Sequence, residues 1–140
     1  MKKLFCWLYP LLFVGCGLAN PITLSAETPK ELFAISEVAR FSKMLHKDIK
    51  GVITPEAYKV AAGVQGCPLD APNGCFAAAW YTPSAIYFWQ EFVNRESTTF
   101  NNLTDIAAHE VCHSVSPNHD QLLQNCILNL GADPQFIPHE

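Results

Sequence analysis

The chain has 140 residues, of which 49% are hydrophobic and 16% are charged, a balance that fits one globular domain and excludes a disordered protein. Its 9 basic and 13 acidic residues give a formal net charge of -4, and no basic cluster follows Lys50. Nucleic-acid binding, which needs a basic patch, is therefore excluded as the expected function.

Residues 1 to 26 are predicted to form a secretory signal peptide. Two lysines precede an apolar run from Leu4 to Leu18, and this run is too short to span a membrane as a helix. Small residues at Ala19 and Ala26 offer two cleavage positions. The alternative is a lipobox ending at Cys16, which would attach the mature chain to a membrane through a lipid. We therefore expect an exported protein in the periplasm, the cell envelope or the extracellular space, with membrane contact only through such a lipid.

Four cysteines follow this segment, and an even number in a chain bound for an oxidising compartment predicts two disulfides. Three pairings are possible in principle. Proximity in sequence favours Cys67 with Cys75, across a turn rich in Pro, Gly and Asn, and Cys112 with Cys126, between consecutive helices.

Residues 27 to 140 are predicted to form a single small α+β domain, which we expect to be a monomer. Thr28-Pro29-Lys30-Glu31 combines a cap, a proline and a glutamate at the positions typical of a helix start. Apolar residues then recur at helical spacing until Gly51 ends the segment. Val52-Ile53 is typical of a short strand, whereas periodicity leaves residues 58 to 64 open between helix and strand.

Two segments rich in aromatic residues, Phe76 to Tyr81 and Ser84 to Phe92, flank Thr82-Pro83 and are predicted to be paired strands joined by a tight turn. One of these strands is expected to form the rim of a substrate cleft. The alternative is that their aromatic side chains serve only in core packing.

The next helix is predicted to begin at a cap on Asn101 or Asn102 and to end before Pro117. One face of this helix is apolar and is expected to pack on the core, while a polar group lies on the other side. The apolar face comprises Ala107, Ala108, Val111 and Val115, and the other side carries Ile106, His109, Glu110 and His113.

A last helix is predicted to begin at a capping box formed by Asn118 and Gln121 and to run to Leu130, where Gly131 follows as the C-terminal stop. This prediction places His119 in the first turn of the last helix.

The segment His109-Glu110-Val111-Cys112-His113 places two imidazoles four residues apart on one helix face, with a carboxylate beside the first. His119 supplies a third ligand, and three protein ligands leave one position of a Zn2+ ion open to water. The ion lowers the pKa of that water to about 7, and Glu110 can take its proton as general base and return it to a leaving amine. We therefore predict one zinc ion and hydrolysis of peptide or protein substrates. Cys112 lies to one side of the group and is assigned to a disulfide.

Residues Thr104 to His113 resemble the active-site helix of the zincin metallopeptidases, and residues Ala79 to Ile86 resemble the edge-strand hairpin of zincins, which binds substrate in an extended conformation. The resemblance implies a minimal zincin-like domain with a small sheet, a backing helix, an active-site helix and a C-terminal helix. It also implies the two motif histidines as zinc ligands and Glu110 as general base. The third His is placed as in the SprT-like and WLM-type zincins. Metzincins instead have a Gly where Ser116 stands and a methionine turn downstream.

Zincins commonly use a Tyr or His to stabilise the oxyanion, and the resemblance leaves Tyr81, Tyr87 and His139 as candidates. Two alternative functions stay open. One is a catalytically silent, zincin-like envelope binding protein. The other is a structural-zinc or metal-binding protein, which a fourth ligand from His139, Glu140 or Asp120 would support.

Overall fold

A computed structural model describes residues 21–64 and 67–134. Most of the predicted signal peptide, including Cys16, lies outside the described residues, as do His139 and Glu140. The predicted α+β class is confirmed, because the described chain forms four helices and two small sheets.

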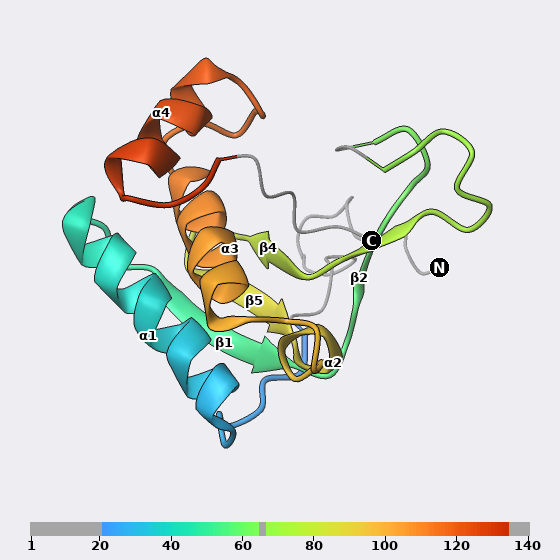
Figure 1. Ribbon diagram of the computed structural model, residues 1–140, viewed down its shortest axis with the longest axis horizontal. Helices are drawn as coiled ribbons and strands as arrows, with labels where there is room; N and C mark the ends of the chain where they lie inside the picture. The colour runs from blue at the N-terminus through green and yellow to red at the C-terminus, as the bar shows by residue number, and fades with distance from the viewer. Residues whose placement is uncertain (1–20, 65–66, 135–140) are drawn as a thin grey trace, which may run out of the picture.

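The elements follow one another from helix to sheet and back to helix (Figure 1). The helices are α1 (Pro29–Met44), α2 (Gln90–Val93), α3 (Phe100–Cys112) and α4 (Gln121–Asn129). The strands are β1 (Lys50–Thr54), β2 (Tyr58–Val60), β3 (Cys75–Ala77), β4 (Ala79–Tyr81) and β5 (Ala85–Trp89).

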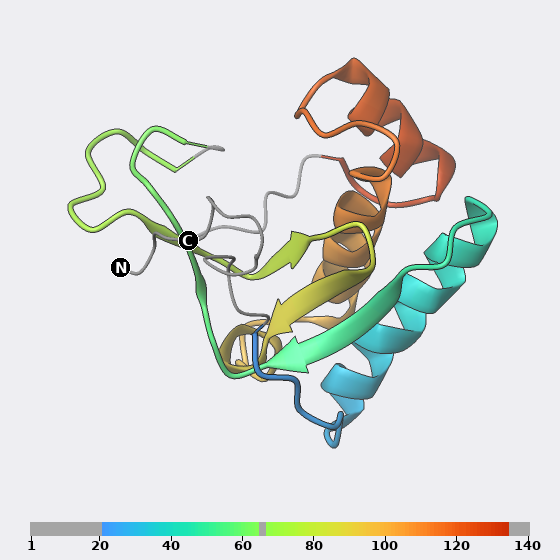
Figure 2. The ribbon, with the colours of Figure 1, turned by 180° about the vertical axis from the view of Figure 1, so that it is seen from behind.

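A three-stranded sheet in the order β1-β5-β4 forms the centre of the domain, with β1 parallel and β4 antiparallel to β5. Helices α1 and α3 lie side by side on one face of this sheet, and the view from behind shows the sheet in front of them (Figure 2). Strands β2 and β3 form a separate antiparallel pair. The main core lies between the helices and the sheet, where the largest side chains are fully buried. Among them are Phe41, Ile53, Phe88, Leu103 and Ile106.

Helix α1 begins as predicted but ends earlier than predicted. The Thr28 side chain accepts a hydrogen bond from the Glu31 N–H at 3.1 Å. The helix stops at Met44 rather than at Gly51, because the chain turns at His46, where φ is +57°. The Ser42 hydroxyl stabilises this turn by donating to the Lys47 carbonyl and accepting from the Ile49 N–H.

Neither aromatic segment forms one continuous strand over its whole predicted length. The first one divides into β3 and β4, which pair with different sheets, and Ala78 between them is buried. The second forms β5 and then turns into α2 at Gln90. The hairpin between β4 and β5 is confirmed, with Thr82 bonded to Ala85 across the turn. The open segment 58–64 begins as strand β2.

Helix α3 begins and ends earlier in the sequence than predicted. Thr99, rather than Asn101 or Asn102, is its N-cap, and Thr99 and Asn102 form a reciprocal capping box. The helix ends at Cys112 instead of continuing toward Pro117. Val115 therefore lies beyond the helix and is 40% exposed, so its predicted place in the core is wrong.

Both favoured disulfide pairings are confirmed, Cys67–Cys75 and Cys112–Cys126. Two disulfides indicate an oxidising environment. None of the helices in the described ranges combines the length and the apolar run that are needed to cross a bilayer.

Candidate metal centre

Helix α3 carries the first two residues of the predicted site in its last turn. Its core face is fully buried, with Leu103, Ala107 and Val111 at 0% exposure, and this packing fixes the rotation of the helix. His109 and Glu110 are themselves 5% and 4% exposed, so the site begins at the base of a cavity.

His113 and His119 lie outside the helices, because α3 ends at Cys112 and α4 begins at Gln121. Sequence periodicity did not indicate these helix ends. His113 is the C-cap of α3. His119 precedes the N-cap of α4, so its predicted position in the first turn of that helix is wrong. The cap is Asp120, whose carboxylate accepts a hydrogen bond from the Leu123 N–H at 3.0 Å. His119 is therefore held in the short connection between α3 and α4.

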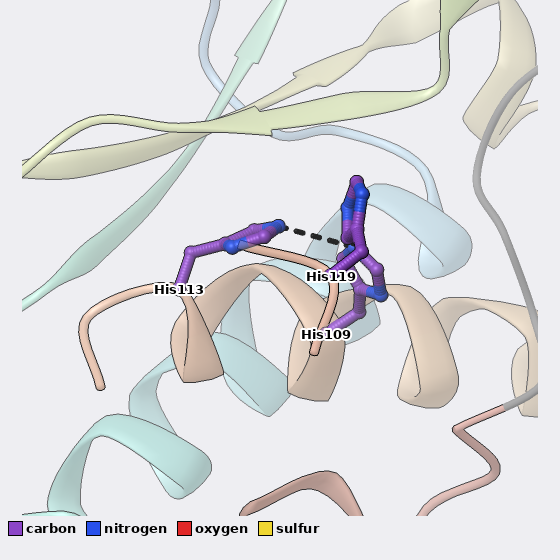
Figure 3. A group of neighbouring side chains, drawn as sticks. All are labelled: His109, His113 and His119. Atoms are coloured by element: carbon purple, nitrogen blue, oxygen red, sulfur yellow. Dashed lines mark hydrogen bonds between the residues drawn. The ribbon is translucent and has the colours of Figure 1, made fainter. Parts of the chain in front are cut away.

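The structure brings the three histidines together (Figure 3). The His109 Nε2 lies 3.2 Å from the Nε2 of His113 and 3.2 Å from the Nε2 of His119, and all three nitrogens lie within 4.8 Å of one another. Nitrogens that bind one zinc ion tetrahedrally at normal Zn–N distances are about 3.3 Å apart. Both separations from His109 are close to this value, so the three histidines form a group able to hold one metal ion.

The ring of His113 is oriented by the backbone. Its Nδ1 lies 3.0 Å from the Ser116 carbonyl oxygen, a geometry in which Nδ1–H donates and the Nε2 lone pair faces the other two histidines. Burial, partly offset by this hydrogen bond, lowers the pKa of His113 and so favours the neutral imidazole that a metal requires.

Glu110 is next to the histidines but does not belong to the cluster of ligand atoms. Its Oε2 lies 4.0 Å from the Nε2 of His109. Burial raises the pKa of Glu110 to about 8. A cation bound nearby favours the ionised carboxylate, so metal binding and the charge of Glu110 are coupled.

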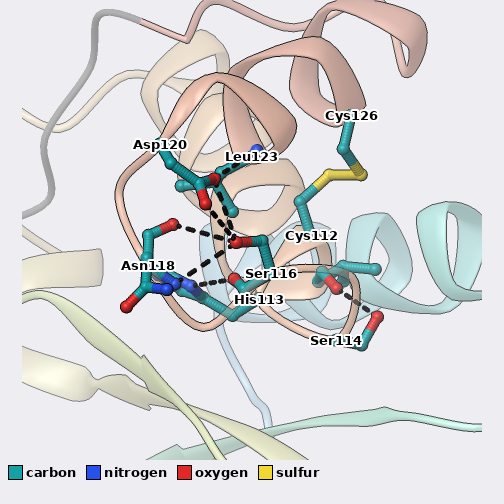
Figure 4. Close-up of a disulfide and its surroundings, with 9 residues drawn as sticks. Cys112, His113, Ser114, Ser116, Asn118, Asp120, Leu123 and Cys126 are labelled. Atoms are coloured by element: carbon teal, nitrogen blue, oxygen red, sulfur yellow. Dashed lines mark hydrogen bonds between the residues drawn. A yellow bond between two sulfur atoms is a disulfide. The ribbon is translucent and has the colours of Figure 1, made fainter.

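Two links hold the connection that carries His119 (Figure 4). The Cys112–Cys126 disulfide joins the last residue of α3 to α4. The buried Ser116 hydroxyl lies 2.9 Å and 3.0 Å from the two carboxylate oxygens of Asp120 and donates to them. Ser116 was considered in the sequence only as a departure from a family pattern, and no local signal indicated that it would orient His113 and hold Asp120.

The three histidines and Glu110 open into a cavity of about 670 Å³. Its remaining wall comes from strands β2 to β5, from residues that flank them, and from Pro21 and Pro117. Among the lining residues are Glu56, Tyr58, Trp80, Tyr81 and Tyr87.

Two of the three candidates for oxyanion support, Tyr81 and Tyr87, line this cavity. The ring of Tyr81 lies 6.4 Å from that of His113, centroid to centroid, so Tyr81 is next to the cluster. Tyr87 stacks on Trp80 instead. The third candidate, His139, lies outside the described residues.

No family model, curated protein or solved structure matches this chain. What is established is therefore a His109, His113 and His119 cluster able to bind a metal ion, in a small α+β domain with two disulfides.

Proposed function

We propose that this protein is an exported zinc metallopeptidase of zincin type. The observation that carries the proposal is the approach of three imidazole nitrogens to within 4.8 Å of one another, with the buried Glu110 beside them, at the base of a cavity. A hydrolytic zinc site combines these same parts: three protein ligands, an open position and a general base.

Zinc is the metal that the donor set favours. Imidazole suits zinc, copper, iron and nickel, and a tetrahedral arrangement favours zinc among them. A closed structural site would need a fourth protein ligand. Asp120, one candidate for that role, is engaged as the cap of α4 and as the acceptor of the Ser116 hydroxyl. Within residues 21–64 and 67–134, only the three histidines form such a group.

The chemistry follows from the residues around the site. When bound, zinc supplies Lewis acidity and brings the pKa of water at its open position to about 7. Glu110 accepts the proton of the water that attacks the peptide carbonyl carbon. It then donates that proton to the departing nitrogen as the C–N bond breaks, which yields a carboxylic acid and an amine. Tyr81, whose ring lies 6.4 Å from that of His113, would stabilise the oxyanion by donating its hydroxyl hydrogen.

The sheet offers a place for an extended peptide. β4 is at one edge of the three-stranded sheet and pairs only with β5 among the described strands. An extended chain can add to such an edge through backbone hydrogen bonds. β4 and the three histidines line the same cavity, so this edge lies beside the metal cluster.

Export is the part of the proposal that rests on the sequence and on the disulfides. The apolar segment after Lys2 and Lys3 is typical of a secretory signal, and Cys67–Cys75 and Cys112–Cys126 require an oxidising compartment to form.

The proposal is tested by incubating the purified mature protein, with one equivalent of zinc, with a mixed peptide library and detecting new termini by mass spectrometry. We expect cleavage that a chelator abolishes and that added zinc restores. His113→Ala serves as the matched variant, because it removes one ligand from the partly exposed end of α3. Absence of cleavage by a protein that binds zinc at unit stoichiometry would refute the proposal.

A further inference from the structure

Three aromatic rings form a continuous stack on one wall of the cavity. Tyr58 stacks on Trp80 with ring centroids 5.3 Å apart, and Trp80 stacks on Tyr87 with centroids 5.4 Å apart. The interplanar angles are 28° and 17°. We call Tyr58, Trp80 and Tyr87 the aromatic ladder. Tyr58 is 46% exposed, and the other two rings are partly exposed, so the ladder is not part of the closed core.

The ladder lies on the opposite face of the sheet from the helices. Trp80 and Tyr87 are cross-strand partners in β4 and β5, so they project on the same side. Their neighbours Ala79 and Phe88, also partners, are buried on the side of α1 and α3. The ladder and the histidines nevertheless line the same cavity, which therefore reaches both faces of the sheet around the edge of β4.

A peptide added to the edge of β4 would present its side chains to these two faces in alternation. Side chains on the helix face would meet Tyr81 and the metal cluster. Side chains on the other face would meet Trp80. Resting on the proposed function, we propose that the substrate is a peptide with an aromatic or large aliphatic residue flanking the scissile bond, and that this side chain packs on the aromatic ladder.

The charges around the cavity agree with a neutral residue at this position. Among the described lining residues there is no lysine or arginine, and the exposed carboxylate is Glu56. At the aromatic ladder, on the opposite face of the sheet from the metal cluster, an acidic side chain would therefore lose its hydration without gaining a lysine or arginine as partner. An apolar side chain would bury its surface against the ring of Trp80, which is favourable.

Binding can be measured separately from cleavage in the Glu110→Gln variant loaded with zinc. Fluorescence anisotropy compares labelled peptides that differ at one position, where Phe, Leu, Gly or Glu stands. We expect the Phe and Leu peptides to bind roughly tenfold more tightly than the Gly peptide, and the Glu peptide to bind most weakly.

Trp80→Ala in the same background should weaken binding of the Phe peptide by roughly tenfold and leave the Gly peptide and the zinc affinity unchanged. Trp80→Phe keeps a ring and should retain most of the preference, which separates loss of contact from loss of fold. Phe76→Ala is the matched control, because Phe76 is an exposed aromatic residue, 43% exposed, that does not line the cavity.

Equal affinity for the Phe, Gly and Glu peptides would overturn the proposal, as would an equal effect of Trp80→Ala on all of them. The proposed function fails by a different result, in which the wild-type protein with zinc binds Phe peptides preferentially but leaves every peptide intact.

Discussion

The disulfide between Cys112 and Cys126 makes a prediction that concerns the metal rather than stability alone. Cys112 directly precedes His113, a proposed metal ligand, and the bond fixes α4 against the end of α3. His119 lies in the connection that the bond closes. We therefore expect Cys112→Ala with Cys126→Ala to weaken zinc binding by loosening His119.

The size of the effect can be worked out from the separations in sequence. Closing 14 residues is worth about 3 kcal/mol on the chain-entropy account, and closing 8 residues at Cys67–Cys75 is worth about 2.5 kcal/mol. The two pairs therefore cost similar stability when removed. Loss of a group that orients a metal ligand typically costs about 10- to 100-fold in metal affinity. We expect this additional loss for Cys112–Cys126 only.

The assay is competition for zinc with a chromophoric chelator, under conditions where circular dichroism shows every variant to be folded. The effect of His119→Ala on zinc affinity is measured in the wild type, in a variant without Cys67–Cys75 and in a variant without Cys112–Cys126. We expect the substitution to weaken zinc binding strongly in the wild type and without Cys67–Cys75, but much less without Cys112–Cys126. An equal loss of zinc affinity on His119→Ala in all three backgrounds would show that the Cys112–Cys126 disulfide does not hold His119 at the metal site.

Three further predictions concern the rest of the domain. Hydrogen bonding from Arg40, partly offset by burial, lowers the pKa of Glu37, so the native state binds fewer protons there. The ionised Glu37 therefore stabilises the folded protein above the ordinary glutamate pKa, and this stabilisation is lost as pH falls through the lowered value. In denaturant titrations, Glu37→Gln should lower the free energy of unfolding at pH 7 but not near pH 2. Ser116→Ala should weaken zinc binding about tenfold, and retention of affinity would contradict its role toward Asp120. Because the Leu24 N–H donates to the Ile53 carbonyl at 2.8 Å, we expect terminal sequencing of the mature protein to find a start before Leu24 rather than at Glu27.

The parts of the site that depend on helical period were predictable from the sequence. Spacing alone placed His109 and Glu110 together on α3, and the structure brings them to the same cavity. The position of His119 was not predictable. The N-cap of α4 is Asp120 rather than the predicted Asn118, because the Asp120 carboxylate accepts hydrogen bonds from the Leu123 N–H and the Ser116 hydroxyl. Asp120 binds both Ser116, in the connection, and the first turn of α4, and such a tertiary role has no periodic pattern in the sequence.

The fold shows the same division between local and tertiary causes. The start of α1 follows from Thr28 and Pro29, which act within one turn. Its early end at Met44 depends on Ser42, whose hydroxyl bonds residues several positions ahead. The split between β3 and β4 depends on partners in two different sheets, so residue type along Phe76 to Tyr81 could not reveal it.

If Glu110 and the three histidines form one hydrolytic centre, Glu110→Gln should abolish most of the cleavage. The substitution keeps the size of the side chain and removes its ability to exchange a proton. At equal zinc occupancy, kcat for cleavage of a Phe-containing peptide should fall by about 100-fold or more, while zinc affinity stays within the range of the wild type. A cleavage rate unchanged by Glu110→Gln would mean that Glu110 is not the general base of this site.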